Sequence, residues 1–360
     1  MTSITEVARR AGVSIATVSR VVSDADYAVS PATRDRVLEA ARELDYVPNA
    51  LARGLLKSRV PVVGVIVHDI TDPYFAEVVR GVEDAATESG YLVIACSSER
   101  DPARELEYVR LLRSMRAAAV VFAGSGIDDA GLVGQLPRHV DGITAYGGTT
   151  VHLSPHALGD PEVSVDNAAG IAALIAAMVA LGHRRIAFLA GPQALYVARD
   201  RVAGYHRGLA EAGVAGDPRL VVATSFDGDG GAEGVDELLR RGVSFTAILC
   251  ANDLLALGAL ARLAALGIGV PAEVSVAGFD DIATAALTSP SLSTVRLPLR
   301  DLGRRGFAFA ERRLAGESPE PEQLPTTVVL RDSTGPAPAA PIDVTAIPRP
   351  SPIEGASPWP

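Results

Sequence analysis

The chain has 360 residues, of which 48% are hydrophobic and 21% charged, and its formal net charge is −10. This length suggests two or three domains, and the composition excludes a disordered chain. No uncharged apolar run reaches eighteen residues and the N-terminus has no apolar secretory core, so we expect a cytoplasmic protein with no membrane partner.

The charge is unevenly distributed along the chain. Residues 1–60 carry nine Lys and Arg against seven Asp and Glu, a net charge of +2, whereas the remaining residues carry −12. A mildly basic segment attached to an acidic body is typical of a nucleic-acid-binding domain joined to a domain with another role.

Capping patterns predict three short helices near the N-terminus. Ser3-Ile4-Thr5-Glu6 has the spacing of a capping box and begins the first helix, which Gly12 ends. Ser14 caps a second helix over about 15–22, and Ser30-Pro31 begins a third. Helix, glycine-containing turn, short helix and third helix form the helix-turn-helix arrangement.

The second of these helices has two unlike faces. Val18, Val21 and Val22 fall on one face, where we expect them to pack with Ala8 and Val13. The other face suits the major groove, because small residues allow close approach and an arginine can bind guanine through two hydrogen bonds. The residues on that face are Ile15, Ala16, Ser19 and Arg20.

Hydroxyl groups surround this second helix. Ser14, Thr17 and Ser19 are placed to donate hydrogen bonds to phosphates. From the pattern alone, an ordinary three-helix bundle with a solvated face remains an alternative.

The segment PNALARGLLKSR, residues 48–59, is either a linker or a short helix that enters the minor groove with a leucine wedged into a base step.

Residues 3–59 resemble the headpiece of the lactose/galactose repressor (LacI-type) family through EVARRAGVSIATVSRVV and VSPATRDRVLEAARELDYVPNALARGL. The resemblance implies a base-reading role for Ile15, Ala16 and Arg20. It implies phosphate contacts for Ser3, Ser14, Thr17 and Ser19. In the hinge helix it implies minor-groove contacts for Asn49, Ala52 and Leu55, of which Leu55 is the intercalating residue.

Apolar strands alternate with amphipathic helices in the rest of the chain. We expect strands at 62–67, 91–97, 118–124, 185–191, 220–224, 246–252 and 274–279. We expect helices at 74–89, 102–116, 167–181, 198–212, 231–241 and 253–266. This alternation predicts doubly wound parallel sheets, which a break near 125–165 divides into two lobes. Ligands of such sheets bind beyond the C-terminal strand ends, here in a cleft between the lobes.

Polar and aromatic residues gather at these strand ends. They are His68-Asp69, Tyr74-Phe75, Asn252-Asp253 and Asp280-Asp281, with Arg201 near a helix start. An arginine, an amide and carboxylates together suit a polyhydroxylated ligand, and adjacent aromatic rings can stack on a sugar or base. Packing explains the aromatic pair equally well, and each carboxylate, Asp253 in particular, can instead be a helix N-cap.

The resemblance to the LacI-type family continues to about residue 332, through DITDPYFAEVVRGVEDAA, CANDLLALGAL and VAGFDD among other stretches. It implies a periplasmic-binding-protein-like core that binds a small effector, a sugar or a related metabolite. Carried over by position, the residues that line its site are Tyr74, Phe75, Leu195, Val197, Arg201, Phe226, Asn252 and Asp280. Leu195 and Val197 stand where family members often have polar groups, which favours a less polar pocket.

These observations divide the chain into domains. They are a headpiece (1–47), a hinge linker (48–60), a two-lobed core (61–332) and a Pro/Ala-rich tail (333–360) that we expect to be disordered. The lobes are about 61–160 with 292–325, and 161–291 with 326–332. The tail lacks the leucine heptads that make tetramers of the lactose repressor, so we expect a homodimer, which two DNA half-sites also require.

The sequence argues against an enzyme. It has no dinucleotide fingerprint, P-loop, GxSxG motif or zinc spacing, so we expect no cofactor or metal, and we expect a packing or turn role for His183. Cys96 and Cys250 lie in apolar runs and are expected to be buried free thiols.

We expect a repressor that binds a near-palindromic operator under effector control, although the sequence leaves open whether the effector induces or corepresses. The alternative is a soluble sugar-binding protein of the periplasmic type.

Overall fold

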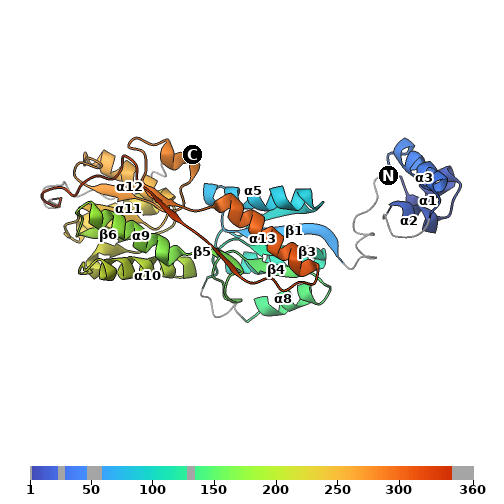
Figure 1. Ribbon diagram of the computed structural model, residues 1–360, viewed down its shortest axis with the longest axis horizontal. Coiled ribbons are helices and arrows are strands. Elements are labelled where there is room, and N and C mark those ends of the chain that lie inside the picture. Colours follow the sequence, from blue (N-terminus) through green and yellow to red (C-terminus); the bar gives the residue numbers. More distant parts are fainter. Residues whose placement is uncertain (1, 23–28, 47–58, 128–133, 343–360) are drawn as a thin grey trace.

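A computed structural model describes residues 2–22, 29–46, 59–127 and 134–342 of the chain. The first three helices are α1 (Ile4–Ala11), α2 (Ile15–Val22) and α3 (Pro31–Glu43) (Figure 1). They pack around a small core of their own, in which Val18 and Val21 of α2 meet Ala8 of α1. The headpiece therefore has the helices and the core that the sequence predicts.

The predicted helix starts are present, but the caps differ in detail. Ser3 completes a capping box with Glu6, and Gly12 ends α1 in the left-handed conformation, with φ of +65°. Ser30 stands at the N-cap of α3 as predicted, yet it makes no side-chain hydrogen bond to the helix backbone. Its hydroxyl donates instead to Thr33 Oγ1 at 2.9 Å.

The first lobe of the core is built on a parallel sheet with strand order β2-β1-β3-β4. The strands are β1 (Val60–Val67), β2 (Leu92–Ser97), β3 (Ala117–Phe122) and β4 (Thr149–His152). Helices α5 (Pro73–Glu88) and α13 (Leu299–Leu314) cover one face, and α6 (Pro102–Ser114) and α8 (Leu136–Thr144) cover the other. Alternate residues of β1 serve the two faces, with Val63 and Val65 toward α5 and Val62 and Ile66 toward α6.

The second lobe repeats this design with strand order β7-β6-β8-β9, again parallel. The strands are β6 (Ile186–Leu189), β7 (Val221–Val222), β8 (Ala247–Cys250) and β9 (Ser275–Ala277). Two helix pairs pack on them, α9 (Asn167–Ala180) with α10 (Tyr196–Glu211), and α11 (Gly228–Arg240) with α12 (Asp253–Ala265) (Figure 1). Every residue of β8 is buried, as expected for a strand covered on both faces.

Short strands connect the two lobes. β10 (Thr294–Arg296) pairs antiparallel with β12 (Thr327–Val329), and β11 (Glu322–Leu324) pairs parallel with β5 (Val163–Val165). β5 leads into α9 of the second lobe, whereas β10 leads into α13 of the first (Figure 1). The connections thus lie beside one another, and the strand ends of both lobes open toward the space between them.

The structure corrects several sequence-based expectations. The expected break near 125–165 contains α8 and β4, and β4 completes the first sheet. Residue 333 does not belong to a disordered tail, because Ser333 is fully buried and donates to Val276 O at 2.7 Å; residues 343–360 lie outside the described part. Cys250 is buried, but Cys96 is only half-buried on β2. No helix in the described residues is long and apolar enough to cross a membrane.

Candidate functional site

Helix α2 presents its predicted groove-facing side to solvent. Ile15 is 47% exposed, and Ala16 and Arg20 are also exposed, while Val18 and Val21 on the opposite side are buried. The structure therefore brings the three predicted base-reading residues onto one accessible face. Such a face, with small and apolar side chains beside an arginine, can approach base edges in a major groove.

The hydroxyls of Ser3, Ser14 and Thr17, which the sequence predicts to contact phosphates, already make hydrogen bonds within the headpiece. Ser14 Oγ accepts from Thr17 N–H at 3.1 Å and lies 2.9 Å from Thr17 Oγ1. Ser3 Oγ accepts from Glu6 N–H at 3.3 Å, and Ser19 is half-buried on α2. Ser3 and Ser14 thus fix the starts of α1 and α2, where backbone N–H groups favour an anion. The predicted hinge residues Asn49, Ala52 and Leu55 lie outside the described residues.

A second candidate site is the pocket between the lobes, which we call the inter-lobe pocket. It encloses about 440 Å³ of empty space, including the part open to solvent. All eight residues that the sequence assigned to the effector line it, namely Tyr74, Phe75, Leu195, Val197, Arg201, Phe226, Asn252 and Asp280. Six further lining residues come from the first lobe, namely His68, Asp72, Arg100, Ala123, Ser125 and Ser154.

Arg201 of α10 is the most firmly held polar group in this pocket. It is 5% exposed, and its guanidinium donates to Asn167 Oδ1 at 2.9 Å, to Ala251 O and to Asp280 Oδ1 at 3.2 Å. Its Cζ also lies 4.1 Å from the ring centroid of Phe279. The guanidinium therefore has one fixed orientation before any ligand enters.

Asp280 is buried opposite Arg201. Burial raises the pKa of this carboxyl well above its usual range, and the Arg201 guanidinium offsets part of that rise. Asp280 and Asp281 have φ of +120° and +57°, a backbone that costs residues with side chains about 1–3 kcal/mol each. This backbone turns Asp280 into the pocket and Asp281 away from it, so that Asp281 bonds Arg296 at 2.6 Å and Arg331 at 2.7 Å.

Asn252, and not Asp253, caps α12. The Asn252 side-chain oxygen accepts from Leu255 N–H at 2.9 Å, which leaves its amide nitrogen to donate toward a ligand. Asp253 is fully buried and accepts from Thr294 Oγ1 at 2.6 Å and from Ile282 N–H at 2.9 Å. Burial raises its pKa to about 7. The alternative of Asp253 as the cap is therefore wrong by one residue.

Aromatic and apolar side chains complete the pocket. Tyr74 and Phe75 meet edge to face with ring centroids 4.9 Å apart, and Phe75 meets His68 in the same way at 5.5 Å. Leu195 and Val197, which stand where family members often have polar groups, line the pocket with apolar side chains. Leu195 is only 2% exposed. The contact between Tyr74 and Phe75 is partly a packing contact, but both residues also line the pocket.

The lobes touch at one edge of the pocket. Ser125, which follows β3 in the first lobe, accepts at Oγ from Val197 N–H in the second lobe at 3.1 Å. Ile127 and Leu195 form an isolated antiparallel bridge beside it. The lobes are therefore held together here in a closed arrangement.

His68 and Arg100 are the most informative residues that the sequence did not assign to the site. His68 directly follows β1, and the sequence indicated its strand-end position without assigning it to the effector. Arg100 follows β2, where Glu99 and Arg100 have φ of +54° and +59° without a glycine to announce the turn. This turn carries the Arg100 guanidinium to within 6.0 Å of the Phe226 ring centroid in the other lobe.

A helix-turn-helix domain with an exposed reading face, joined to two α/β lobes around a polar pocket, defines a ligand-responsive DNA-binding transcriptional regulator. Residues 3–49 match the model of bacterial regulatory proteins of the lacI family, and residues 175–334 match a periplasmic binding protein-like domain. The chain is 35% identical to the HTH-type transcriptional regulator GalR of Salmonella typhimurium, over 89% of this chain and 92% of that protein. The chain belongs to the LacI family and is a transcriptional regulator, not an enzyme.

Solved structures agree with this assignment. The lac repressor dimer bound to operator and the anti-inducer ONPF superposes with a TM-score of 0.78 at 27% identity, over 93% of this chain and 99% of that one. A complex of the transcriptional regulator CelR with cellobiose gives a TM-score of 0.67 at 33% identity, over 92% and 100%. The family and the fold class predicted from the sequence are confirmed, whereas the roles of individual site residues stay predictions.

Proposed function

We propose that this protein is a dimeric repressor that binds a near-palindromic operator under the control of a sugar or related metabolite bound in the inter-lobe pocket. Its place of action is the cytoplasm, where bacterial operator DNA lies. The observation that carries this proposal is the combination, in one chain, of the exposed α2 face and a pocket lined by both lobes.

The α2 face supports sequence-specific DNA binding. Ile15 and Ala16 suit the methyl groups of thymine, and Arg20 suits the O6 and N7 atoms of guanine. Ser3, Ser14, Thr17 and Ser19 with the adjacent backbone N–H groups suit phosphates, and the hinge residues Asn49, Ala52 and Leu55 suit the minor groove. One headpiece reads one half-site, so a palindromic operator requires two copies of the chain.

Exposed apolar residues on both lobes support a dimer. Leu92 on the edge strand β2 is 63% exposed, and Leu287 in the second lobe is 82% exposed. Exposed apolar side chains and an open strand edge favour association with another copy. The structure of the lac repressor dimer on operator DNA is consistent with this assembly.

The chemistry of the pocket supports a neutral, hydroxylated effector. Arg201 and Asp280 offset each other's charge, and together with the Asn252 amide they supply donors and acceptors to hydroxyl groups. The apolar wall of Leu195 and Val197 suits the C–H face of a sugar ring. The CelR complex with cellobiose is a relative with a ligand of this class.

The backbone after Asp280 supports coupling between the pocket and the lobe connections. Asp280 lines the pocket, and its neighbour Asp281 bonds Arg296 of β10 and Arg331 after β12. A ligand that forms a hydrogen bond with Asp280 therefore acts on the strands that link the lobes. Coupling of this kind amounts to about 1–3 kcal/mol and is reciprocal, so operator and effector change each other's affinity by the same factor.

The test is operator selection from genomic fragments with purified protein, followed by fluorescence anisotropy with a panel of sugars. We expect preference for an inverted repeat and a change in operator affinity with at least one sugar, whose direction gives the sign of control. The absence of any preference for an inverted repeat would contradict the proposal of a repressor. Sugar binding without DNA binding would support the alternative of a periplasmic-type sugar-binding protein.

A substitution in α2 makes this test specific. Arg20→Ala should cost about 1–3 kcal/mol of discrimination at one guanine-containing position. Arg10→Ala, which removes an exposed arginine of α1 paired with Glu43 at 2.7 Å, is the matched control and should leave discrimination unchanged. An equal loss on random DNA would assign Arg20 to a phosphate.

A further inference from the structure

Five arginines of the first lobe gather near the end at which the chain enters the core, and we call the surface that they share the basal face. They come from the start of β1, the second half of α6, the turn after it, and α8, and they are Arg59, Arg110, Arg113, Arg116 and Arg138. Four of them are exposed, and Arg59 is half-buried. None forms an ion pair with a carboxylate within the described residues.

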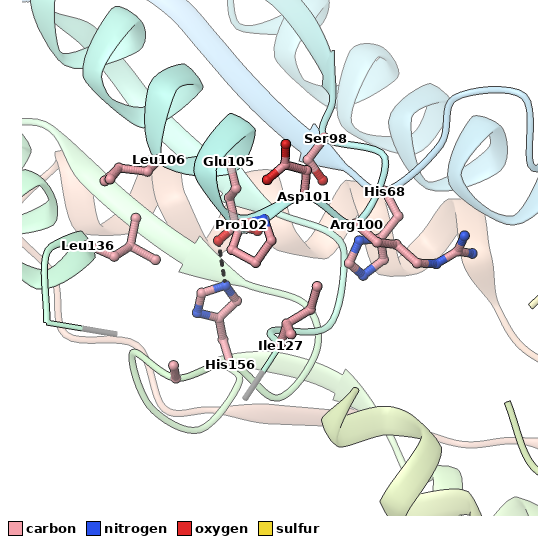
Figure 2. Close-up of a pocket in the computed structure, with 11 residues that line it drawn as sticks. His68, Ser98, Arg100, Asp101, Pro102, Glu105, Leu106, Ile127, Leu136 and His156 are labelled. Atoms are coloured by element: carbon pink, nitrogen blue, oxygen red, sulfur yellow. Dashed lines mark hydrogen bonds and ion pairs between the residues drawn. The ribbon is translucent and has the colours of Figure 1, made fainter. Parts of the chain in front are cut away.

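Helices α6 and α8 form the body of the basal face, and they pack side by side. Figure 2 shows Leu106 of α6 and Leu136 of α8 beside a cavity that both line near the strand ends, so the later parts of both helices extend away from that edge. There the Arg113 guanidinium donates to His139 Nδ1 at 3.2 Å. A Cβ on Gly142 would lie 2.2 Å from Arg113 Cζ, so this glycine lets the guanidinium lie on the backbone of α8.

Arg110 and Arg116 lie close to Arg113 on this surface. Partial burial lowers the pKa of the His139 ring, and the charges of Arg113 and Arg110 lower it further. Partial burial raises the pKa of Tyr146 to about 12, and the charges of Arg113 and Arg116 offset part of that rise. The three arginines therefore act on the same neighbours and form one positive cluster.

The chain enters the core at the edge of this cluster. Val60 N–H, at the start of β1, donates to Arg116 O at 2.9 Å. The Arg59 guanidinium donates to Gly147 O at 2.6 Å and to Leu314 O at 3.2 Å. The basal face is therefore the part of the core that adjoins the linker from the headpiece.

The other face of the same sheet pairs its arginines with acidic residues. On α13, Arg300 bonds Asp84 of α5 at 2.6 Å, and Arg304 bonds Glu88 at 3.3 Å. The exposed acidic residues of α6 and α8 are Glu107 and Asp141, and neither forms an ion pair with an arginine of the basal face within the described residues. The excess of positive charge is thus particular to the basal face.

Helix dipoles account for only part of this excess. Arg113 stands in the last turn of α6, where a cation is favoured. Arg138, however, stands in the first turn of α8, where the dipole favours an anion. Arg110 and Arg113 are one helical turn apart, a spacing at which like charges destabilise a helix. An anionic partner would relieve both of these unfavourable placements.

The charges elsewhere in the chain indicate that this partner is DNA. The described residues of the headpiece carry six arginines and five acidic residues, and the chain beyond residue 60 has a net charge of −12. Residues 47–58 span at most about 45 Å when fully extended, so DNA on the headpiece lies close to the core. A duplex carries one negative charge per about 1.7 Å, so an acidic core beside it needs a basic surface there.

We propose that the basal face contacts the phosphate backbone of DNA that flanks the operator, which makes the core a second DNA-binding surface. Exposed guanidinium groups form charge-assisted hydrogen bonds with phosphate oxygens, and such contacts carry no base specificity. This proposal rests on the proposed function, because the headpiece must first bring DNA to the core. It adds that the core contributes to affinity and the headpiece to sequence choice.

The test is the salt dependence of operator affinity, measured by fluorescence anisotropy on two duplexes. One ends at the half-sites, and the other extends about two helical turns beyond them on each side. We expect a steeper fall of log affinity with log salt concentration on the longer duplex, by about 0.9 for each additional phosphate contact. The double variant Arg110→Ala with Arg138→Ala should flatten that slope by about the same amount per contact and leave the shorter duplex unchanged.

These two arginines are exposed and make no hydrogen bond within the described residues, so their removal should leave the fold intact, which thermal unfolding checks. The matched control is Arg219→Ala with Arg240→Ala, which removes the same charge from exposed positions of the second lobe and should change neither slope.

Equal slopes for the two duplexes would overturn the proposal. An equal effect of the two double variants would also overturn it, because the effect would then come from net charge alone. If the basal variant binds both duplexes like the natural chain, the face serves a partner other than DNA and the proposal fails. If the natural chain prefers no inverted repeat, the proposed repressor fails, whereas the basal face still predicts that its variant binds random duplex more weakly than the control variant does.

Discussion

The two walls of the inter-lobe pocket differ in how their polar groups are satisfied. On the second-lobe wall, Arg201 donates to three partners and the Asn252 oxygen caps α12. On the first-lobe wall, the Nε of Arg100 and both ring nitrogens of His68 are buried without a hydrogen bond of full geometry among the described residues, with the Ser125 backbone the nearest partner of the His68 ring. Apart from the Asn252 amide nitrogen, these second-lobe groups have their hydrogen bonds before a ligand arrives, whereas the buried first-lobe groups do not.

This difference assigns separate tasks to the lobes. A wall whose groups already hold their orientations loses little entropy on binding, so it can fix the position of a ligand. A wall with unsatisfied groups gains hydrogen bonds only when the ligand is present, so its free energy favours the liganded, closed state. We therefore expect the second lobe to orient the effector and the first lobe to make closure depend on it.

Removal of Arg201 tests the complete wall and should have the largest effect. Arg201→Ala leaves Asp280 buried without its counter-ion, so we expect the free energy of unfolding to fall by about 3–5 kcal/mol and sugar binding to disappear. Urea denaturation and calorimetry measure the two effects. Arg207→Ala on the exposed side of α10 should change stability by less than about 0.5 kcal/mol. Loss of binding without loss of stability would contradict a preformed ion pair.

A buried carboxyl of the second lobe that does not itself line the pocket, Asp253, should also make stability depend on pH. Its folded-state pKa of about 7 lies above the ordinary value of 3.8, so the folded state binds the proton more tightly than the unfolded state. The associated stability is fully present below about pH 4 and is lost as pH rises through 7. Asp253→Asn imitates the protonated side chain and should be about 2–4 kcal/mol more stable than the natural chain at pH 8.

Unfolding curves between pH 5 and pH 8 check this expectation. Asp84→Asn is the control, because the hydrogen bond from Arg300 lowers the pKa of this exposed carboxyl, and its loss should not reduce the decline toward high pH. A natural chain whose stability does not fall between these pH values would show that Asp253 is ionised in the fold.

Local patterns made the headpiece predictable from the sequence, whereas long-range packing limited the prediction of the core. The capping box at Ser3 and the valine spacing of α2 involve residues within one or two helical turns of each other. The sequence did not predict helix α13, because Gly303 and Gly306 lie inside it. Glycine within a helix costs about 1 kcal/mol relative to alanine and so argues against a helix. A Cβ on Gly303 would lie 2.0 Å from Val78 O, so this glycine permits close packing of α13 on α5.

The candidate site divides in the same way. Position at strand ends was enough to single out Asn252 and Asp280, because parallel strands end at a common edge, whereas Arg201 was noted near a helix start. Arg100 could not be found, since the two left-handed residues that direct its side chain carry no glycine or asparagine. The choice between Asn252 and Asp253 as the cap depended on one residue of helical phase, which a sequence pattern does not resolve.

Replacement of His68 tests the incomplete wall, and its two effects should have opposite signs. His68→Leu removes two unsatisfied buried nitrogens at similar volume, so we expect the ligand-free chain to become about 1–3 kcal/mol more stable while sugar affinity falls. The control is His183→Leu, because His183 is equally buried but bonds Thr246 Oγ1 at 2.9 Å and Gly335 O at 3.1 Å. That variant should be destabilised. If both variants lose stability, His68 is satisfied in solution and the contrast between the walls is wrong.

The smallest expected effect concerns the hydrogen bond that joins the walls. Ser125→Ala removes the acceptor for Val197 N–H, the contact at 3.1 Å that crosses between the lobes. A bond of this kind contributes about 0.5–1.5 kcal/mol, so the closed arrangement should become about 2- to 10-fold less populated. Small-angle X-ray scattering of the ligand-free chain should then give a larger radius of gyration, and a saturating sugar should restore the natural value, because the ligand bridges both walls. Ser114→Ala on the exposed side of α6 should leave the scattering unchanged. An unchanged radius in Ser125→Ala would mean that the other backbone contacts between the lobes, the Ile127–Leu195 bridge and the hydrogen bond from Tyr196 N–H to Gly126 O at 3.4 Å, hold the lobes closed without it.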